Sequence, residues 1–200
     1  MPQLGPQAER LSRLPPPLRC FAGFGMAAWL DRLERLVLRS RALQSHVLAV
    51  HRRALATVLQ QVREPGRILV VGGGLFPRTA ILLRERWPRA HVCVLDRDPD
   101  HLVLARRWLP EIELRCGSFP DAALEPADLV VLPLALRGSR SRALAAAFAA
   151  GARHVLVHDW WWRCPPSGVA VGGWLLKGVW LATSSVVPAM PDAPGLVEPA

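Results

Sequence analysis

Three consecutive glycines, Gly72 to Gly74, follow directly on the apolar run ILVV and precede the segment LFPRTA. Glycines after a buried strand allow the backbone to come close to a ligand. A phosphate-cradling loop would need a lysine followed by Ser or Thr, but Pro77, Arg78 and Thr79 stand there. The dinucleotide fingerprint G-x-G-x-x-G matches Gly72 and Gly74 but has Pro77 at the third glycine. The phosphate loop is therefore rejected, the dinucleotide match is poor, and a turn that binds nothing is the alternative.

A second candidate site is the segment HDWWWRC, where His158 and Asp159 end a strand-like run. A histidine beside a carboxylate can serve as a base or orient a substrate. The alternative is a helix cap next to a surface histidine. Of the three tryptophans 160–162, we expect one or two to pack on the core or close over the site.

Two other kinds of site are not supported by the residue spacing. No His/Cys set has the spacing of zinc ligands, and there is no G-x-S-x-G nucleophile elbow. The four cysteines form no C-x-x-C pair, and Cys93 and Cys116 fall in strand-like runs. We therefore expect these two cysteines to be small core residues of a protein in a reducing compartment.

Alternating strands and helices must position these residues. The apolar runs predict strands at 67–72, 90–96, 112–117, 127–136 and 152–159, and helices at 78–87, 100–109 and 139–150. Such strands, separated by helices, indicate a parallel sheet covered on both faces. We predict a Rossmann-like, doubly wound, mostly parallel sheet with a C-terminal antiparallel hairpin formed by 169–176 and 178–187. Ligands of such sheets bind beyond the carboxyl ends of the strands.

The organisation of the chain outside the sheet follows from proline, glycine and helical periodicity. Residues 1–25 read as a Pro-rich leader, and 26–65 as an N-terminal helical cap made of two helices that break near Ser45. The Rossmann-like domain is expected to span 66–187, and 188–200 to be a flexible tail. The apolar stripe of the helical cap predicts that it covers the ligand edge of the sheet or forms a homodimer contact.

The net charge of +9 comes from 25 basic residues, of which Lys177 is the only lysine. The arginine excess lies mainly in the N-terminal segment, which could contact an acidic partner or nucleic acid. A solvated helix face is the alternative that we favour. The apolar stretch 168–190 contains Lys177 and three early glycines, which argue against a membrane span. We expect no membrane partner and a cytoplasmic protein.

The segments ILVVGGG and VCVLDRDPDHLVLARRWL, together with the strand order, resemble the class I S-adenosylmethionine (SAM)-dependent methyltransferase family across roughly 66–160. The resemblance implies SAM as cofactor, with Asp96 holding both ribose hydroxyls through charge-assisted hydrogen bonds. It also implies that the glycine loop contacts the methionine part of the cofactor. The expected cofactor-binding residues are Gly72, Gly73, Gly74, Pro77, Thr79, Asp96, Arg97, Ser118, Phe119 and Pro133.

Three positions depart from the family pattern: Val70 replaces an acid before the glycines, Phe76 a third glycine, and Ser118 an adenine-binding Asp. The sequence GGGLFPRTA is most similar to the loop of nicotianamine-synthase-like enzymes, which transfer the aminocarboxypropyl arm of SAM. We therefore expect a SAM-dependent methyltransferase of a small-molecule acceptor. Aminocarboxypropyl transfer, a non-catalytic scaffold that kept the fold, and an NAD-dependent oxidoreductase are the alternatives.

Overall fold

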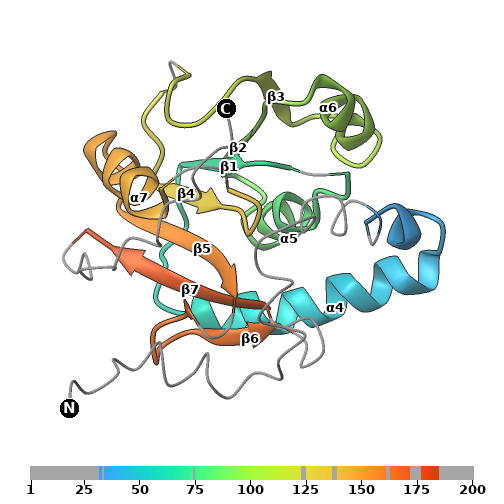
Figure 1. The fold of residues 1–200 in the computed structure, drawn as a ribbon, viewed down its shortest axis with the longest axis horizontal. Helices are drawn as coiled ribbons and strands as arrows, with labels where there is room; N and C mark the ends of the chain where they lie inside the picture. Colours follow the sequence, from blue (N-terminus) through green and yellow to red (C-terminus); the bar gives the residue numbers. More distant parts are fainter. Residues whose placement is uncertain are drawn as a thin grey trace, which may run out of the picture.

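The computed structural model describes residues 32, 34–73, 75–122, 125–136, 139–160, 163–171 and 177–184. Within this part of the chain, a seven-stranded sheet has the order β3-β2-β1-β4-β5-β7-β6 (Figure 1). The strands are β1 (Arg67–Val71), β2 (His91–Asp96), β3 (Glu113–Cys116), β4 (Leu129–Leu132), β5 (His154–Trp160), β6 (Val169–Val171) and β7 (Lys177–Thr183). The helices are α4 (Arg41–Val58), α5 (Arg78–Arg86), α6 (Pro99–Arg106) and α7 (Arg140–Ala149).

The strand pairing is that of a doubly wound sheet. β1 pairs in parallel with β2 on one side and with β4 on the other, so the chain changes direction across the sheet at this point. β5 continues the parallel series, and β7 pairs antiparallel with both β5 and β6. The predicted Rossmann-like fold with a C-terminal antiparallel hairpin is confirmed. β4 ends at Leu132 because Pro133 has no N–H group to donate to a sheet.

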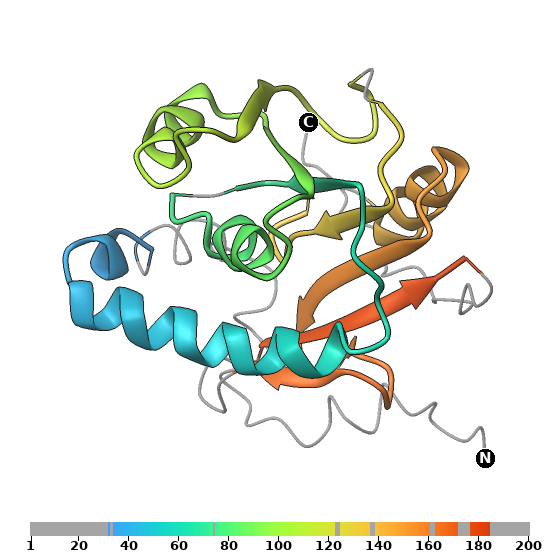
Figure 2. The same cartoon turned by 180° about the vertical axis from the view of Figure 1, so that it is seen from behind.

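Two apolar layers form on opposite faces of the sheet, as the alternation of strand side chains requires. Ile68 and Val70 of β1 join one core with residues of α4 and α5, while Leu69 and Val71 join the other with residues of α7. α4 also contacts β6 and β7 and crosses them in the view from behind (Figure 2). α4 therefore packs onto the antiparallel part of the sheet.

The break between the two N-terminal helices lies at Arg39 and Ser40, and the prediction of a break near Ser45 is wrong. The Ser40 backbone is extended, and its hydroxyl accepts the backbone N–H of Leu43 at 3.3 Å, which caps α4. Ser45 lies inside α4. A serine begins a helix where its backbone is extended, and the sequence offered two serines for that position.

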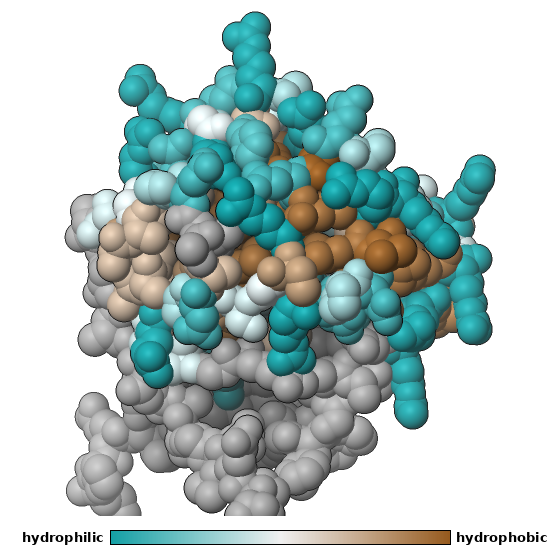
Figure 3. All heavy atoms as spheres, turned by 90° about the horizontal axis from the view of Figure 1, so that it is seen from above, coloured by the Kyte–Doolittle hydropathy of each residue, from teal (hydrophilic) through white to brown (hydrophobic). Residues whose placement is uncertain are grey.

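One cysteine also differs from its prediction. Cys93 is buried in β2 as expected, but Cys116 is exposed because it ends β3, the outermost strand on its side of the sheet. The predicted leader 1–25, the tail 188–200 and Trp161–Trp162 lie outside the described residues. No described helix is long and apolar enough to cross a membrane. Seen from above, the surface shows hydrophilic residues around an apolar band (Figure 3).

Candidate functional site

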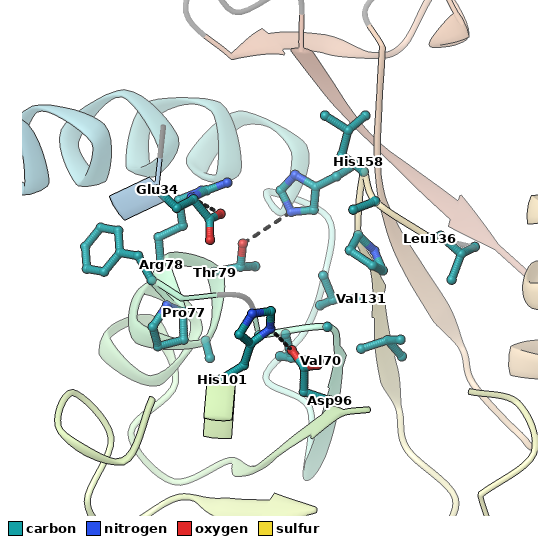
Figure 4. A pocket seen from close by; sticks show the side chains of 18 of the residues that line it. Glu34, Val70, Pro77, Arg78, Thr79, Asp96, His101, Val131, Leu136 and His158 are labelled. Carbon is teal, nitrogen blue, oxygen red and sulfur yellow. Dashed lines mark hydrogen bonds and ion pairs between the residues drawn. The ribbon is translucent and has the colours of Figure 1, made fainter. Parts of the chain in front are cut away.

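A cavity of about 810 Å³ opens at the carboxyl ends of the parallel strands. Its walls come from the N-terminal helical segment, α4, the glycine turn, α5 and the ends of β2 to β5, with the start of β7 (Figure 4). Most of the predicted site residues line it, namely Gly72, Gly73, Pro77, Thr79, Asp96, Arg97, Ser118, Phe119, Pro133 and His158. Asp159 does not line the cavity, and Gly74 lies outside the described residues.

The two described glycines of the turn are needed for the backbone path. Gly72 has a φ of +67°, which side chains rarely adopt, and its N–H donates to the Leu95 carbonyl at 2.7 Å. A Cβ on Gly73 would lie 2.8 Å from a methyl group of Val94. The turn therefore stays against the sheet with no side chain between the backbone and the cavity.

The LFPRT segment has Phe76 and Pro77 where the compared patterns have a third glycine, and it brings Thr79 beside the cavity. Pro77 is the N-cap residue of α5, and no side chain caps this helix. The Thr79 hydroxyl lies 3.3 Å from Nε2 of His158. Thr79 therefore lines the cavity at the start of α5 and does not cap the helix.

Asp96 and His101 form the acidic end of the cavity. Asp96 is 6% exposed, and its Oδ1 accepts the backbone N–H of Asp98 at 3.0 Å. His101 of α6, which the sequence reasoning missed, places Nδ1 3.5 Å from Asp96 Oδ2. Asp121 also lines the cavity. It stands three residues after Ser118, the position at which the family pattern has an Asp. A carboxylate has about four acceptor sites and can accept the hydrogens of hydroxyl groups.

Asp159 lies on the opposite face of β5 from His158, as neighbours on a strand must. The Asp159 side chain is fully buried, and its Oδ2 is 3.3 Å from Nε of Arg140 in an ion pair. The Arg140 guanidinium also donates to the carbonyls of Pro133, Leu134 and His158. The predicted His158–Asp159 pair does not form. Asp159 instead fixes the arginine that joins the ends of β4 and β5.

A buried basic cluster forms the other end of the cavity and was not predicted. Glu34 Oε1 accepts from Arg78 at 2.9 Å, and Arg78 Nε donates to His51 Nε2 at 3.2 Å. The rings of His51 and His158 lie 6.4 Å apart. Lys177 also lines this end and is 8% exposed. In Figure 4, Asp96 lies on one side of Thr79 and His158 on the other.

Burial and crowding of positive groups disfavour charge in this cluster. Burial lowers the pKa of Lys177 well below its usual 10.5, and the Arg78 guanidinium lowers it further, while Glu34 acts in the opposite direction. Burial also holds the pKa of His51 and that of His158 well below 6.5, with Lys177 the next largest cause for each. His51 donates from Nδ1 to the Val47 carbonyl at 2.9 Å, so its Nε2 is the acceptor that Arg78 needs.

Acid is therefore expected to destabilise the protein through His51 and His158. Below pH 6.5 the unfolded chain protonates both rings while the folded chain keeps them neutral, so the unfolded state binds more protons. As the pH decreases below 6.5, the free energy of unfolding should therefore decrease by about 1.4 kcal/mol per pH unit for each histidine. Urea unfolding measured at several pH values checks this.

The matched variants are His158→Gln and His46→Gln, the second at an exposed histidine of α4. His158→Gln should remove the His158 contribution of about 1.4 kcal/mol per pH unit, and His46→Gln should leave the slope unchanged. Equal slopes in the wild type and in His158→Gln would contradict the explanation.

The sequence held weak signals for the missed residues. His51 falls on the apolar stripe of its helix, and Lys177 is the only lysine of the chain. His101 stands five positions after Asp96, in the segment that resembles a cofactor-binding run. Within the described ranges, no group of three or more His, Cys, Asp or Glu residues could hold a metal ion.

Comparisons with known proteins identify the fold. No family model and no curated protein matches the sequence. The solved structure of the nicotianamine synthase MtNAS with MTA and tNA superposes with a TM-score of 0.54 at 15% identity, over 75% of this chain and 67% of that chain. Together with the sheet order, this similarity establishes the Rossmann-like fold.

Two methyltransferase structures are further neighbours. The plantazolicin methyltransferase BpumL, in complex with SAH and a desmethylPZN analog, gives a TM-score of 0.48 at 13% identity over 62% of this chain. The precorrin-6y C5,15-methyltransferase of Geobacter metallireducens gives 0.46 at 15% identity over 54% of this chain. The present chain spans 50% and 60% of the lengths of these two neighbours.

Proposed function

We propose that this protein is a SAM-dependent transferase acting on a small-molecule acceptor. The observation that carries the proposal is the position of Asp96, a buried carboxylate at the end of β2 that lines the same cavity as Gly72 and Gly73. The cavity lies at the point where β1 is flanked by β2 and β4, which is the binding place of doubly wound sheets. Its volume of about 810 Å³ is in the range of small-molecule sites.

In this proposal, each end of the cavity has its own task. The Asp96 carboxylate accepts the two ribose hydroxyls, while Ser118, Phe119 and Asp121 border the adenine. The glycine turn and Pro133 border the methionine part, with Arg97 at the rim. Bound SAM supplies a carbon already activated by the sulfonium. The chain therefore mainly has to orient the acceptor at the His158 end and exclude water.

SAM can donate its methyl group or its aminocarboxypropyl group. Methyl transfer is the first candidate because the family resemblance favours it. A specific observation supports aminocarboxypropyl transfer as the second. Val70, which replaces the usual acid before the glycines, is buried in the sheet, and Phe76 is buried at the loop. The charged groups at that end of the cavity, Glu34 and Arg78, form an ion pair between the N-terminal helical segment and α5. MtNAS, whose structure contains MTA, shares the fold.

Binding and product analysis test the proposal. We expect calorimetry to show binding of SAM and S-adenosylhomocysteine (SAH) and none of NAD. Incubation with SAM and a cell extract as acceptor pool should then yield enzyme-dependent SAH by mass spectrometry for methyl transfer. Methylthioadenosine (MTA) as the sole product would establish the second candidate.

Boiled protein and the Asp96→Asn variant are the controls for enzyme-dependent product. Binding of NAD alone would replace the proposal with an oxidoreductase. Binding of none of the three compounds would favour a non-catalytic scaffold.

A further inference from the structure

The single lysine of the chain, Lys177, lies at a buried position where its amine can become neutral, which an arginine side chain cannot do. All other basic residues are arginine, yet Lys177 occupies the buried wall of the cavity. An arginine side chain stays protonated in proteins, whereas a buried lysine can lose its proton and act as a base. Lys177 is therefore the one Lys or Arg side chain of the sequence that can become neutral.

The sheet directs Lys177 into the cavity. Lys177 begins β7 and pairs with Trp160 of β5, so the two side chains lie on the same face. His158, two positions before Trp160, shares that face, while Asp159 points to the opposite one. This register explains why Trp160, His158 and Lys177 line the cavity together and Asp159 does not.

The other titratable groups around Lys177 are already engaged. His51 uses both ring nitrogens, one toward Val47 and one toward Arg78. Glu34 accepts from Arg78 and from the backbone N–H of Leu75. The described part of the chain contains no hydrogen bond or ion pair of the Lys177 amine.

His158 is also poorly placed to accept a proton from a substrate. Its Nε2 lies against the Thr79 hydroxyl, and its Nδ1 is enclosed by protein with no hydrogen-bond partner. Among the described residues that line this end of the cavity, Arg78 of α5 is the positive group facing Lys177, His51 of α4 and His158 of β5 are neutral histidines, and Glu34 is the acid. Burial and the Arg78 charge both favour the neutral amine, which agrees with the lowered pKa of Lys177.

We propose that Lys177 is a catalytic proton acceptor whose neutral amine contacts the acceptor molecule and removes a proton from its nucleophilic amine or hydroxyl group. The nucleophilic atom forms a bond to the transferred carbon while the carbon–sulfur bond breaks and its electron pair stays on sulfur. The proton of the nucleophile goes to Nζ, so that Lys177 ends as an ammonium and charge balances. This inference rests on the proposed function and names the substrate class as acceptors that must lose a proton.

Because Lys177 is the only lysine, its titration can be followed directly. The full chain is labelled with lysine carrying carbon-13 at the ε position, and its single resonance is followed by NMR against pH. The midpoint should lie well below 10.5, and Arg78→Gln should raise it by removing a neighbouring positive charge. Arg89→Lys adds a second resonance at an exposed site as an internal reference. A Lys177 midpoint at or above that of the reference would overturn the proposal.

Two substitutions separate proton acceptance from simple charge. Lys177→Met and Lys177→Arg should both bind SAH within about twofold of the wild type, and both should slow product formation by about 100-fold or more, as loss of a general base does. Rescue of turnover by Lys177→Arg would show that only a positive charge is needed and would overturn the proposal. Failure of wild-type SAH binding would instead refute the transferase assignment, while the NMR midpoint still reports on Lys177.

Discussion

Replacing Asp96 with asparagine is expected to weaken SAH binding at least tenfold without unfolding the protein. A hydrogen bond to a charged group contributes about 1.5–3 kcal/mol, and the carboxylate is expected to receive two from the ribose. Asparagine keeps the oxygen that accepts the Asp98 N–H but loses the charge and one acceptor. Calorimetry with SAH measures the affinity, and thermal unfolding without ligand measures the stability.

The control is Asp100→Asn, an exposed acid in the first turn of α6 that does not line the cavity. It should bind SAH as the wild type does. If Asp96→Asn also binds normally, the ribose lies elsewhere in the cavity. A large fall in the melting temperature with unchanged affinity would show that Asp96 acts mainly on the turn before α6.

Asp159→Ala should lower the free energy of unfolding by about 3–5 kcal/mol, because it leaves the partly buried Arg140 guanidinium without its fully buried ion-pair partner. Asp159 is fully buried, and its Oδ1 also accepts the backbone N–H of Trp160 at 2.8 Å. Burial already lowers the pKa of Arg140, so its guanidinium depends on the carboxylate for compensation. Urea unfolding of the two proteins at neutral pH measures the difference.

Glu85→Ala provides the matched comparison, since Glu85 pairs with Arg52 at the surface, where both side chains are about half exposed. Surface ion pairs contribute roughly 0–1 kcal/mol, so this variant should unfold almost as the wild type does. Equal losses for the two variants would mean that Arg140 needs no compensation and finds enough partners in its three carbonyls.

The sheet could be read from the sequence because each strand is a local pattern. Apolar runs separated by helices predict parallel strands. The glycines and Asp96 follow two of these runs, and the carboxyl ends of parallel strands lie at one edge of the sheet. The predicted break near Ser45 lies five residues beyond the observed cap at Ser40, since serine favours the start of a helix wherever the backbone allows it. Cys116 was predicted to lie in the core because it belongs to a strand. It is exposed because β3 is an edge strand, which the local sequence does not reveal.

The basic end of the cavity could not be predicted, because it joins residues that are distant in sequence. His51 reads as one position of an amphipathic helix, and Lys177 as a charge within an apolar stretch. Asp159 looked like a partner of His158 because the two are neighbours, whereas strand alternation separates their side chains. Only the β5–β7 register brings Lys177 beside His158.

The position of β7 also bears on how the chain folds during synthesis. All seven residues of β5 pair with β7, which is made later, so a nascent chain that stops before Lys177 exposes one full edge of β5. An unpaired strand edge is a template for association with other chains. The cavity is likewise incomplete until β7 has left the ribosome, so affinity for the cofactor should arise late in synthesis, together with closure of that edge.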